Sequence, residues 1–321
     1  MLLGLAAGLA ACGDGGTSEL TPITVQLKWL HQTQFAGFYA ADQNGYYADE
    51  GLSVTLLAGG ANVDLVGSVL DGTAQFGITM ADQLLVLRSE GAPVRAIATI
   101  YRRSPVVFGS LASSGITRPQ DIVGKTVCST QANLSVFNAM MASVGISADQ
   151  YAEVPYPDDL GQLVTGDASV WSLYSTGSAL ELEAKGHQLN YILPDDYGVH
   201  FYADTIFASE DLLAADPDLV MRFLRATLKG WRYAVENVDE VAAMVSEYNP
   251  DADTALETVK MEVSIPLIRT GEDHIGWMKH EVWAGIQQIL REQGMLSGSV
   301  DVGQAYDMQF VEEIYAVETG R

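Results

Sequence analysis

Residues 23–57 read ITVQLKWLHQTQFAGFYAADQNGYYADEGLSVTLL, and this stretch decides the fold. Its first five residues, 23–27, alternate between apolar and polar side chains and predict a strand. A short helix is predicted over residues 35–44, because Gly45 follows where helices commonly end in a left-handed glycine. Residues 52–57 then predict a second strand. Strands that alternate with helices in this way indicate an α/β domain with a central sheet.

The same alternation continues along the chain. Further strands are predicted at 76–79, 94–100, 106–111, 126–128, 150–154, 168–173, 191–193 and 205–208. Further helices are predicted at 63–70, 81–90, 119–122, 135–144, 160–165, 218–236, 238–248, 252–263 and 280–293. We therefore predict two α/β lobes with a central cleft and hinge crossings: lobe 1 from residues 22–115 and 203–321, with the C-terminal helices, and lobe 2 from residues 116–202.

The N-terminal segment, residues 1–12, has the pattern of a lipoprotein signal. An apolar run leads to Leu9-Ala10-Ala11-Cys12, and at about 11 residues it is too short to cross a bilayer as a helix. Residues 13–21 are polar and glycine-rich, which is typical of a tether. We expect Cys12 to carry lipid and to hold the chain on the extracytoplasmic face of the cell membrane. The alternative is an ordinary apolar segment with an incidental cysteine.

The composition argues against a nucleic-acid partner, a disulfide framework and a metal site. The chain has 321 residues, of which 17 are basic and 41 acidic, and its net charge of −24 repels the phosphate backbone of nucleic acids. With Cys12 assigned to lipid, Cys128 stands alone, so a disulfide framework is excluded. The five histidines are scattered and predict no metal site. We expect a monomer without a cofactor.

Several segments, in their order and spacing, carry a family resemblance. They are Leu27-Lys28-Trp29, residues 36–41, 45–47, 50–54, 71–78, 121–125, Tyr202-Ala203-Asp204, residues 222–231 and 276–278. From Trp29 almost to the C-terminus, the chain resembles the NMT1/THI5-like substrate-binding proteins of ABC importers. The resemblance implies a periplasmic-binding-protein type II fold that delivers a ligand to a membrane permease and its ATPase. It also implies a ligand class: thiamine pyrimidine precursors, riboflavin or, in more distant branches, sulfonates.

Candidate ligand contacts come from the positions that match the family and from the ends of the predicted strands, where open α/β sheets bind ligands. Aromatic rings supply stacking faces, while amides, hydroxyls and carboxylates select among heterocycles. The predicted contacts are Trp29, Gln32, Gln34 and Phe35 in the first loop, Asn62, Thr79 and Asp82 in lobe 1, Gln131, Asn133, Trp171 and Tyr174 in lobe 2, and Tyr202 and Asp204 at the return crossing.

Most of these residues have an alternative structural explanation. In the first loop, Trp29 would be a core residue, Gln32 and Gln34 would face solvent, and Phe35 would anchor the next helix. Four polar residues would cap helices: Asn62, Asp82, Gln131 and Asn133. Trp171 and Tyr174 would pack under the hinge, and Asp204 would fix the hinge. Arg102 and Arg103 would suit a phosphate or sulfonate, or would lie in a solvated loop.

We predict a non-catalytic protein whose lobes close on a flat vitamin-type heterocycle. The rival hypothesis is an enzyme of the thiamine-pyrimidine synthase branch, which the resemblance associates with a loop histidine, a cofactor-bearing lysine and a cysteine-rich iron motif. Lys28 lies near this loop, but Phe35 stands at the histidine position and Cys128 has no cysteine cluster around it. A further alternative is a sensor with the same two-lobed shape that signals to a membrane kinase.

Overall fold

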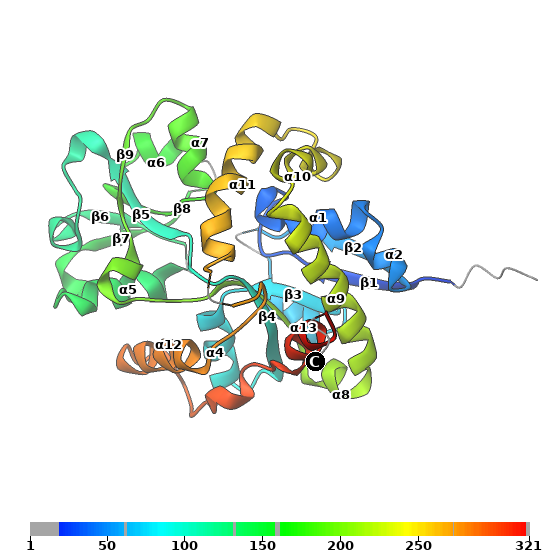
Figure 1. Cartoon of the computed structure of the whole chain (residues 1–321). Coiled ribbons are helices and arrows are strands. Elements are labelled where there is room, and N and C mark those ends of the chain that lie inside the picture. The colour runs from blue at the N-terminus through cyan, green and yellow to red at the C-terminus, as the bar shows by residue number, and fades with distance from the viewer. Residues whose placement is uncertain (1–18, 61–62, 131–132, 158–160, 272, 319–321) are drawn as a thin grey trace, which may run out of the picture.

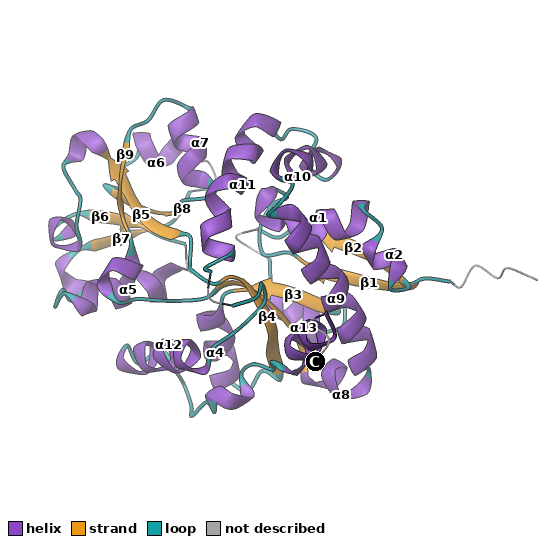
Figure 2. Cartoon of the chain, viewed as in Figure 1, coloured by secondary structure: helices purple, strands orange, loops and turns teal. Residues whose placement is uncertain are grey.

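The structure contains two mixed five-stranded sheets, each covered by helices (Figure 1; Figure 2). It is a computed structural model that describes residues 19–60, 63–130, 133–157, 161–271 and 273–318. The first sheet has the order β2-β1-β3-β10-β4, formed by Leu52–Leu57, Thr21–Gln26, Phe76–Thr79, Ala203–Ser209 and Val94–Tyr101. The second has the order β7-β6-β8-β5-β9, formed by Ala152–Val154, Thr126–Cys128, Val170–Tyr174, Val106–Leu111 and Leu189–Ile192. Each sheet with the helices packed on it is called a lobe below.

The two sheets share one topology. In the first, β1 is parallel to β2 and β3, while β10 is antiparallel to β3 and β4. In the second, β6 is parallel to β7 and β8, while β5 is antiparallel to β8 and β9. In both, the antiparallel strand is the one that enters from the other lobe, through residues 102–105 or 193–202. The predicted two-lobed α/β architecture with two crossings is therefore confirmed.

The crossing from the first sheet comes earlier than the sequence predicted. The boundary at residues 115 and 116 assigned β5 to lobe 1, but β5 pairs with β8 and β9 of the second sheet. The pattern of apolar residues identifies β5 as a strand and carries no information on which sheet it joins. The turn around Pro119–Ile122, a short 3-10 helix, resembles a boundary but lies inside the second lobe.

Helices cover both sheets. The α-helices are α1 (Ala36–Gln43), α2 (Tyr46–Asp49), α3 (Leu65–Leu70), α4 (Ala81–Ser89), α5 (Leu134–Ser143), α6 (Gly161–Thr165), α7 (Ser178–Ala184), α8 (Glu210–Ala215), α9 (Pro217–Ala234), α10 (Val238–Met244), α11 (Thr254–Ile268), α12 (His280–Glu292) and α13 (Gln309–Glu318). The sequence pattern missed α2, α7, α8 and α13. It predicted α9 well, because Asp216 caps it, Pro217 opens it and a regular apolar stripe faces the core.

Two C-terminal helices lie against both lobes. Helix α11 contacts α7 of the second lobe and the 3-10 helix η1 (Thr33–Phe35) of the first. Figure 1 shows α11 between α7 and the helices α1 and α10 of the first lobe. Helix α12 packs against α4 and α5 and buries Trp283, Ile286 and Leu290. These side chains belong to a hydrophobic cluster that includes residues of both lobes. No helix in the described part of the chain combines the length and the apolar character needed to cross a membrane.

The first lobe depends on a close approach of α1 and α9. A Cβ atom on Gly230 would lie 2.1 Å from the carbonyl oxygen of Gly37 and 2.8 Å from the Cβ of Ala41. A Cβ on Gly37 would in turn lie 2.2 Å from the ring of Trp231. Only glycine at these two positions lets the helices meet at this distance.

We expect Gly230→Ala to lower the free energy of unfolding by about 1–3 kcal/mol, because the added methyl group forces the two helices apart. Gly285→Ala is the matched control: it also lies inside a helix, α12, and a Cβ there meets no atom within 4 Å. The control should gain up to about 1 kcal/mol from helix propensity. Urea unfolding measures both, and equal effects would contradict the packing argument.

Candidate functional site

Polar side chains from both lobes converge where strands of the two sheets end. Lys28 follows the carboxyl end of β1, Tyr101 ends β4 and Tyr174 ends β8. Asp204 is the second residue of β10, and because β10 is antiparallel to β3 and β4, its start lies at the edge where they end. Ligands of open α/β sheets bind at this edge.

The centre of this cluster is a buried ion pair. The Nζ atom of Lys28 lies 2.7 Å from Oδ1 of Asp204, and the two side chains are 12% and 3% exposed. Lys28 also donates a hydrogen bond to the hydroxyl of Tyr174, so the contact joins the first lobe to the second. Burial by itself lowers the pKa of Lys28, but Asp204 and Tyr174 outweigh this effect and raise the pKa above its usual value. Lys28 is therefore an ammonium at neutral pH.

The first loop completes the surroundings of Asp204. Nε2 of Gln34 donates to both carboxylate oxygens, at 3.1 and 2.8 Å. Gln32 donates to Oε1 of Gln34 at 2.9 Å, so the two amides form a chain that ends on the carboxylate. Asp204 has a φ of 47°, a left-handed conformation that no other described non-glycine residue adopts. Residues held in such conformations cluster at ligand-binding sites.

A second buried carboxylate lies nearby on helix α4. Asp82 is 1% exposed and accepts a hydrogen bond from the hydroxyl of Ser135, on α5 of the second lobe. Its Oδ1 atom is buried without a hydrogen-bond partner of good geometry, although the N–H groups of residues 82 and 83 lie close enough to lower its pKa. Burial outweighs these contacts and the charge of Lys28, and raises the pKa of Asp82 to about 6. Asp82 does not cap α4, whose cap position is Met80.

The structure brings together about half of the predicted contacts. Gln32, Gln34, Tyr174 and Asp204 form the network described above, and Asp82 lies at the same junction between the lobes. Trp29 is half-buried beside Lys28 and packs on the core of the first lobe. Thr79, at the end of β3, is buried and donates to Gln83 at 2.5 Å. Asn133 is buried at the start of α5.

Two predicted aromatic contacts, Phe35 and Trp171, lie in the core instead. Phe35 is 1% exposed within the apolar cluster of the first lobe, which favours its role as an anchor for α1. Trp171 packs with Cys128 and Leu173 in a separate cluster of the second lobe. It faces away from Tyr174 because the two are three residues apart along β8, where side chains alternate between faces.

Tyr202 also differs from its prediction. It packs against Trp283 at the second crossing, and its hydroxyl accepts a hydrogen bond from the N–H of Lys279 at 3.0 Å. Its position is that of a hinge residue packed on α12. Three further predictions, Cys12, Asn62 and Gln131, lie outside the described residues.

Sequence reasoning missed four residues of the site. Lys28 had a signal, because a lysine follows directly on an apolar strand and precedes Trp29. The sequence signal for Tyr101 was weaker, namely its position at the end of a strand. In the structure its hydroxyl donates a hydrogen bond to Ser264 at 3.0 Å. Glu257 and Lys260 had no signal, because α11 is remote in sequence from the loop that it contacts. Glu257 accepts from the N–H of Thr33 at 2.6 Å and also from its hydroxyl, and so holds the first loop in place.

Two surface cavities, of about 250 and 370 Å³, lie elsewhere on the first lobe. Both are lined by Gly271, Asp273 and His274, and the larger one also by Trp277. None of the predicted ligand contacts lines either cavity. Arg102, considered above as an anion ligand, is instead buried against Asp273 and Thr270.

Comparison with known proteins identifies the family. The profile of the NMT1/THI5 like family matches residues 32–241, well over half of the chain. The chain belongs to this family.

Three curated relatives align along most of their length. The riboflavin-binding protein RibY of Chloroflexus aurantiacus is 27% identical, covering 95% of this chain and 90% of its own. The formylaminopyrimidine-binding protein of Halalkalibacterium halodurans is 29% identical, covering 83% and 79%.

The third relative is named as an enzyme. It is the 4-amino-5-hydroxymethyl-2-methylpyrimidine phosphate synthase of Legionella pneumophila, which is 24% identical and covers 91% of this chain and 92% of its own. Among solved structures, the alkanesulfonate-binding protein SsuA of Xanthomonas axonopodis pv. citri, bound to MOPS, aligns with a TM-score of 0.72 at 12% identity. That alignment covers 90% of this chain and 99% of the other. This similarity confirms the predicted periplasmic-binding-protein fold.

We expect Asp82→Asn to change the pH dependence of stability. The pKa of Asp82 is raised in the folded state, so the folded chain binds the proton more tightly than the unfolded chain, and ionisation destabilises the fold as the pH rises from about 4 to about 6. The asparagine variant lacks this cost. Relative to the wild type, its free energy of unfolding should gain up to about 3 kcal/mol between pH 4 and pH 7.

Urea unfolding at several pH values measures this difference. Asp71→Asn is the control, because Asp71 is exposed and its pKa is lowered by hydrogen bonds from Thr73. Relative to the wild type, the control should change in the opposite direction with rising pH. Parallel curves for Asp82→Asn and the wild type would show that Asp82 ionises as an ordinary surface carboxylate.

Proposed function

We propose that this chain is a solute-binding protein that captures a flat, uncharged nitrogen heterocycle between its lobes and delivers it to an ABC permease. The observation that carries the proposal is the network of Lys28, Asp204, Gln34 and Tyr174. It gathers hydrogen-bond donors and acceptors at the junction of the lobes, and Trp29 follows Lys28 directly in the chain. A planar ring edged with N–H and C=O groups matches such a set, and its face suits an aromatic side chain.

The charges near the site favour a neutral ligand over a sulfonate. Three buried cations of the described chain already have carboxylate partners: Lys28 pairs with Asp204, Arg102 with Asp273, and Lys260 with Glu181 and Glu257. Asp82 adds a further acidic group at the junction. A sulfonate needs an unpaired cation or several free N–H groups, and it would be repelled by these carboxylates.

The state of Lys28 favours capture over catalysis. A lysine that forms an imine with a cofactor must lose its proton, and enzymes achieve this by lowering its pKa. The carboxylate of Asp204 has the opposite effect on Lys28. In addition, Phe35, at the position of the loop histidine of the synthase branch, is buried in the core and unable to take part in acid–base chemistry.

Riboflavin and thiamine pyrimidine precursors are the two ligands that we propose to test. Both carry ring nitrogens with polar substituents, and two relatives that cover most of this chain are named for ligands of these kinds. The proposed partners are a membrane permease and its ATPase, and the proposed location is extracytoplasmic.

Mass spectrometry of the ligand that co-purifies with the protein, followed by calorimetry with riboflavin and with formylaminopyrimidine, tests this function. We expect one of them to bind with a dissociation constant of micromolar or below and to be released unchanged on denaturation. Chemical conversion of the bound compound, or binding of alkanesulfonates in place of both heterocycles, would overturn the proposal.

We expect Trp29→Ala to weaken binding of that heterocycle at least tenfold while the protein stays folded, because the indole supplies the stacking face. Trp277→Ala is the control, since Trp277 is also half-buried on the first lobe but lines the larger surface cavity. Calorimetry measures affinity, and circular dichroism checks the fold. Equal affinities of the two variants would show that the heterocycle does not stack on Trp29.

We further propose that Cys12 is the site of lipid attachment. In the native host, Cys12→Ala should move the protein from the membrane fraction to the soluble fraction, and labelled fatty acid should no longer be incorporated. Cys128→Ala is the control, because Cys128 is buried in the second lobe and its thiol donates to the carbonyl of Pro155. Unchanged fractionation of the Cys12 variant would exclude this anchor.

A further inference from the structure

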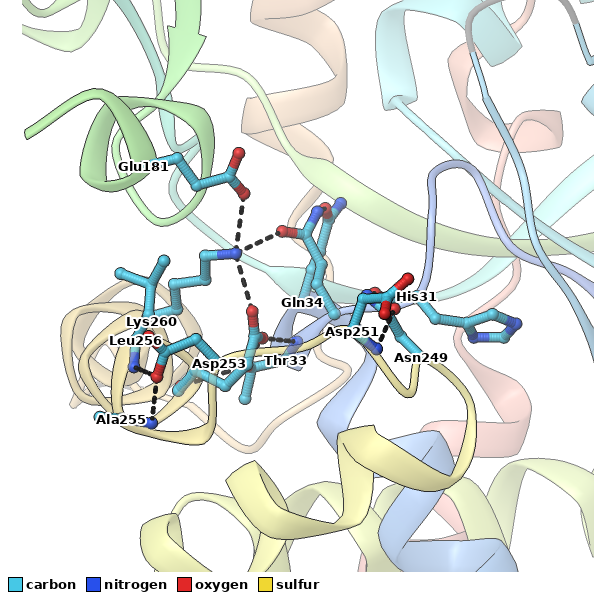
Figure 3. A network of polar contacts seen from close by, with 12 residues as sticks. His31, Thr33, Gln34, Glu181, Asn249, Asp251, Asp253, Ala255, Leu256 and Lys260 are labelled. Atoms are coloured by element: carbon cyan, nitrogen blue, oxygen red, sulfur yellow. Dashed lines mark hydrogen bonds and ion pairs between the residues drawn. The ribbon is translucent and has the colours of Figure 1, made fainter. Parts of the chain in front are cut away.

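A charged contact joins the two lobes on the side of α11. Lys260 lies on this helix, is 5% exposed, and places Nζ 2.9 Å from Oε1 of Glu181 on α7. The same atom lies 2.8 Å from Oε1 of Glu257 and 3.4 Å from Oε1 of Gln32 in the first loop. Figure 3 labels Lys260 and Glu181 and marks the contacts of the ammonium group with dashed lines. One side chain thus reaches the second lobe, its own helix and the loop of the candidate site.

The two carboxylates differ in how firmly they are held. Glu257 is buried, lies one turn before Lys260 on α11, and accepts hydrogen bonds from both the N–H and the hydroxyl of Thr33. Glu181 is one-third exposed and belongs to the other lobe. If the lobes separate, Lys260 loses Glu181 but keeps Glu257, so no unpaired charge remains buried. The contact can therefore break at a modest cost, unlike a buried pair that loses its only partner.

The opposite side of the junction has a different character. There, Trp283, Ile286 and Leu290 of α12 belong to an apolar cluster with members from α4 of the first lobe and α5 of the second. Apolar packing of this kind keeps the same neighbours as two domains rotate by small angles. A polar contact that can break on one side and a packed apolar cluster that stays together on the other are compatible with rotation of the two lobes about the crossings.

The charged contact also reaches the ligand network. Gln32, which accepts from Lys260, donates to Gln34, and Gln34 donates to Asp204. A continuous chain of hydrogen bonds therefore connects Glu181 of the second lobe with the carboxylate beside Lys28. Lys260 lies at the branch point of this chain.

We propose that the pair Lys260–Glu181 is a latch that holds the lobes closed and sets the rate at which ligand leaves. It acts by positioning the lobes and the first loop. The proposal rests on the proposed function, because a latch matters for a protein that closes on a ligand. Its test therefore has one arm with riboflavin and one arm without any ligand.

The first arm measures release of riboflavin by its fluorescence. We expect Glu181→Gln to speed dissociation about 5- to 20-fold and to change association less than threefold, because the latch forms after the ligand has entered. Glu183→Gln is the matched control: it lies on the same helix and removes the same charge, but its carboxylate accepts from Tyr191 within the second lobe. Faster release in both variants would show that only the net charge of α7 matters, and would overturn the latch.

The second arm measures the distance between the lobes in the free protein. Spin labels are placed at the exposed residues Lys185 and Glu247, in a chain whose native cysteines are replaced by serine. Electron–electron double resonance then measures the distance between the two labels. We expect Glu181→Gln to add a population with a longer distance, and Glu183→Gln to leave the distribution unchanged. An unchanged distribution in Glu181→Gln would overturn the latch. A changed distribution in a protein that binds no riboflavin would support the latch and reject that ligand.

Discussion

The buried ion pair of Lys28 and Asp204 is the interaction on which the site depends. Taking two charges out of water costs more than their attraction returns unless further hydrogen bonds complete both groups. Gln34 donates a hydrogen bond to the carboxylate of Asp204, and the hydroxyl of Tyr174 accepts one from the ammonium of Lys28. Since Tyr174 comes from the second lobe, the pair is fully satisfied only while the lobes are together. The cost of burying these charges is thus linked to closure, and a ligand with its own donors and acceptors can share in offsetting it.

Much of the fold could be predicted from the sequence, and the reasons are local. Strands β2, β3 and β5 occur where their apolar patterns and flanking turns place them, and α9 has a cap, a proline and an apolar stripe that identify it. Helix α7 was missed, because its seven residues are too few to show a helical period against the strands around it. The membership of β5 in the second sheet was missed for another reason: strand pairing is a long-range property that no local pattern encodes.

The site was predictable only in part. Polar residues next to strand ends, such as Gln34 and Asp204, were predicted to lie together and do so, because topology brings all such ends to one edge. Aromatic residues were predicted less well, since Phe35 and Trp171 have the composition of ligand contacts but fill the core. Their burial depends on which face of a strand or helix meets the sheet. Glu257 and Lys260 could not be predicted from the sequence, because α11 approaches the first loop only in the folded chain.

Asp204 connects the site with the hinge. It is the second residue of β10 and therefore follows directly on the crossing from the second lobe, with Tyr202 packed on α12 two positions before it. Its left-handed backbone is held by contacts of its side chain to Lys28 and Gln34, since a non-glycine residue in this conformation needs such support. Any ligand group that competes for the carboxylate of Asp204 changes the forces on the backbone at the crossing. We therefore expect Asp204 to couple binding to lobe rotation, alongside the hydrogen-bond chain that leads from it through Gln34 and Gln32 to Lys260.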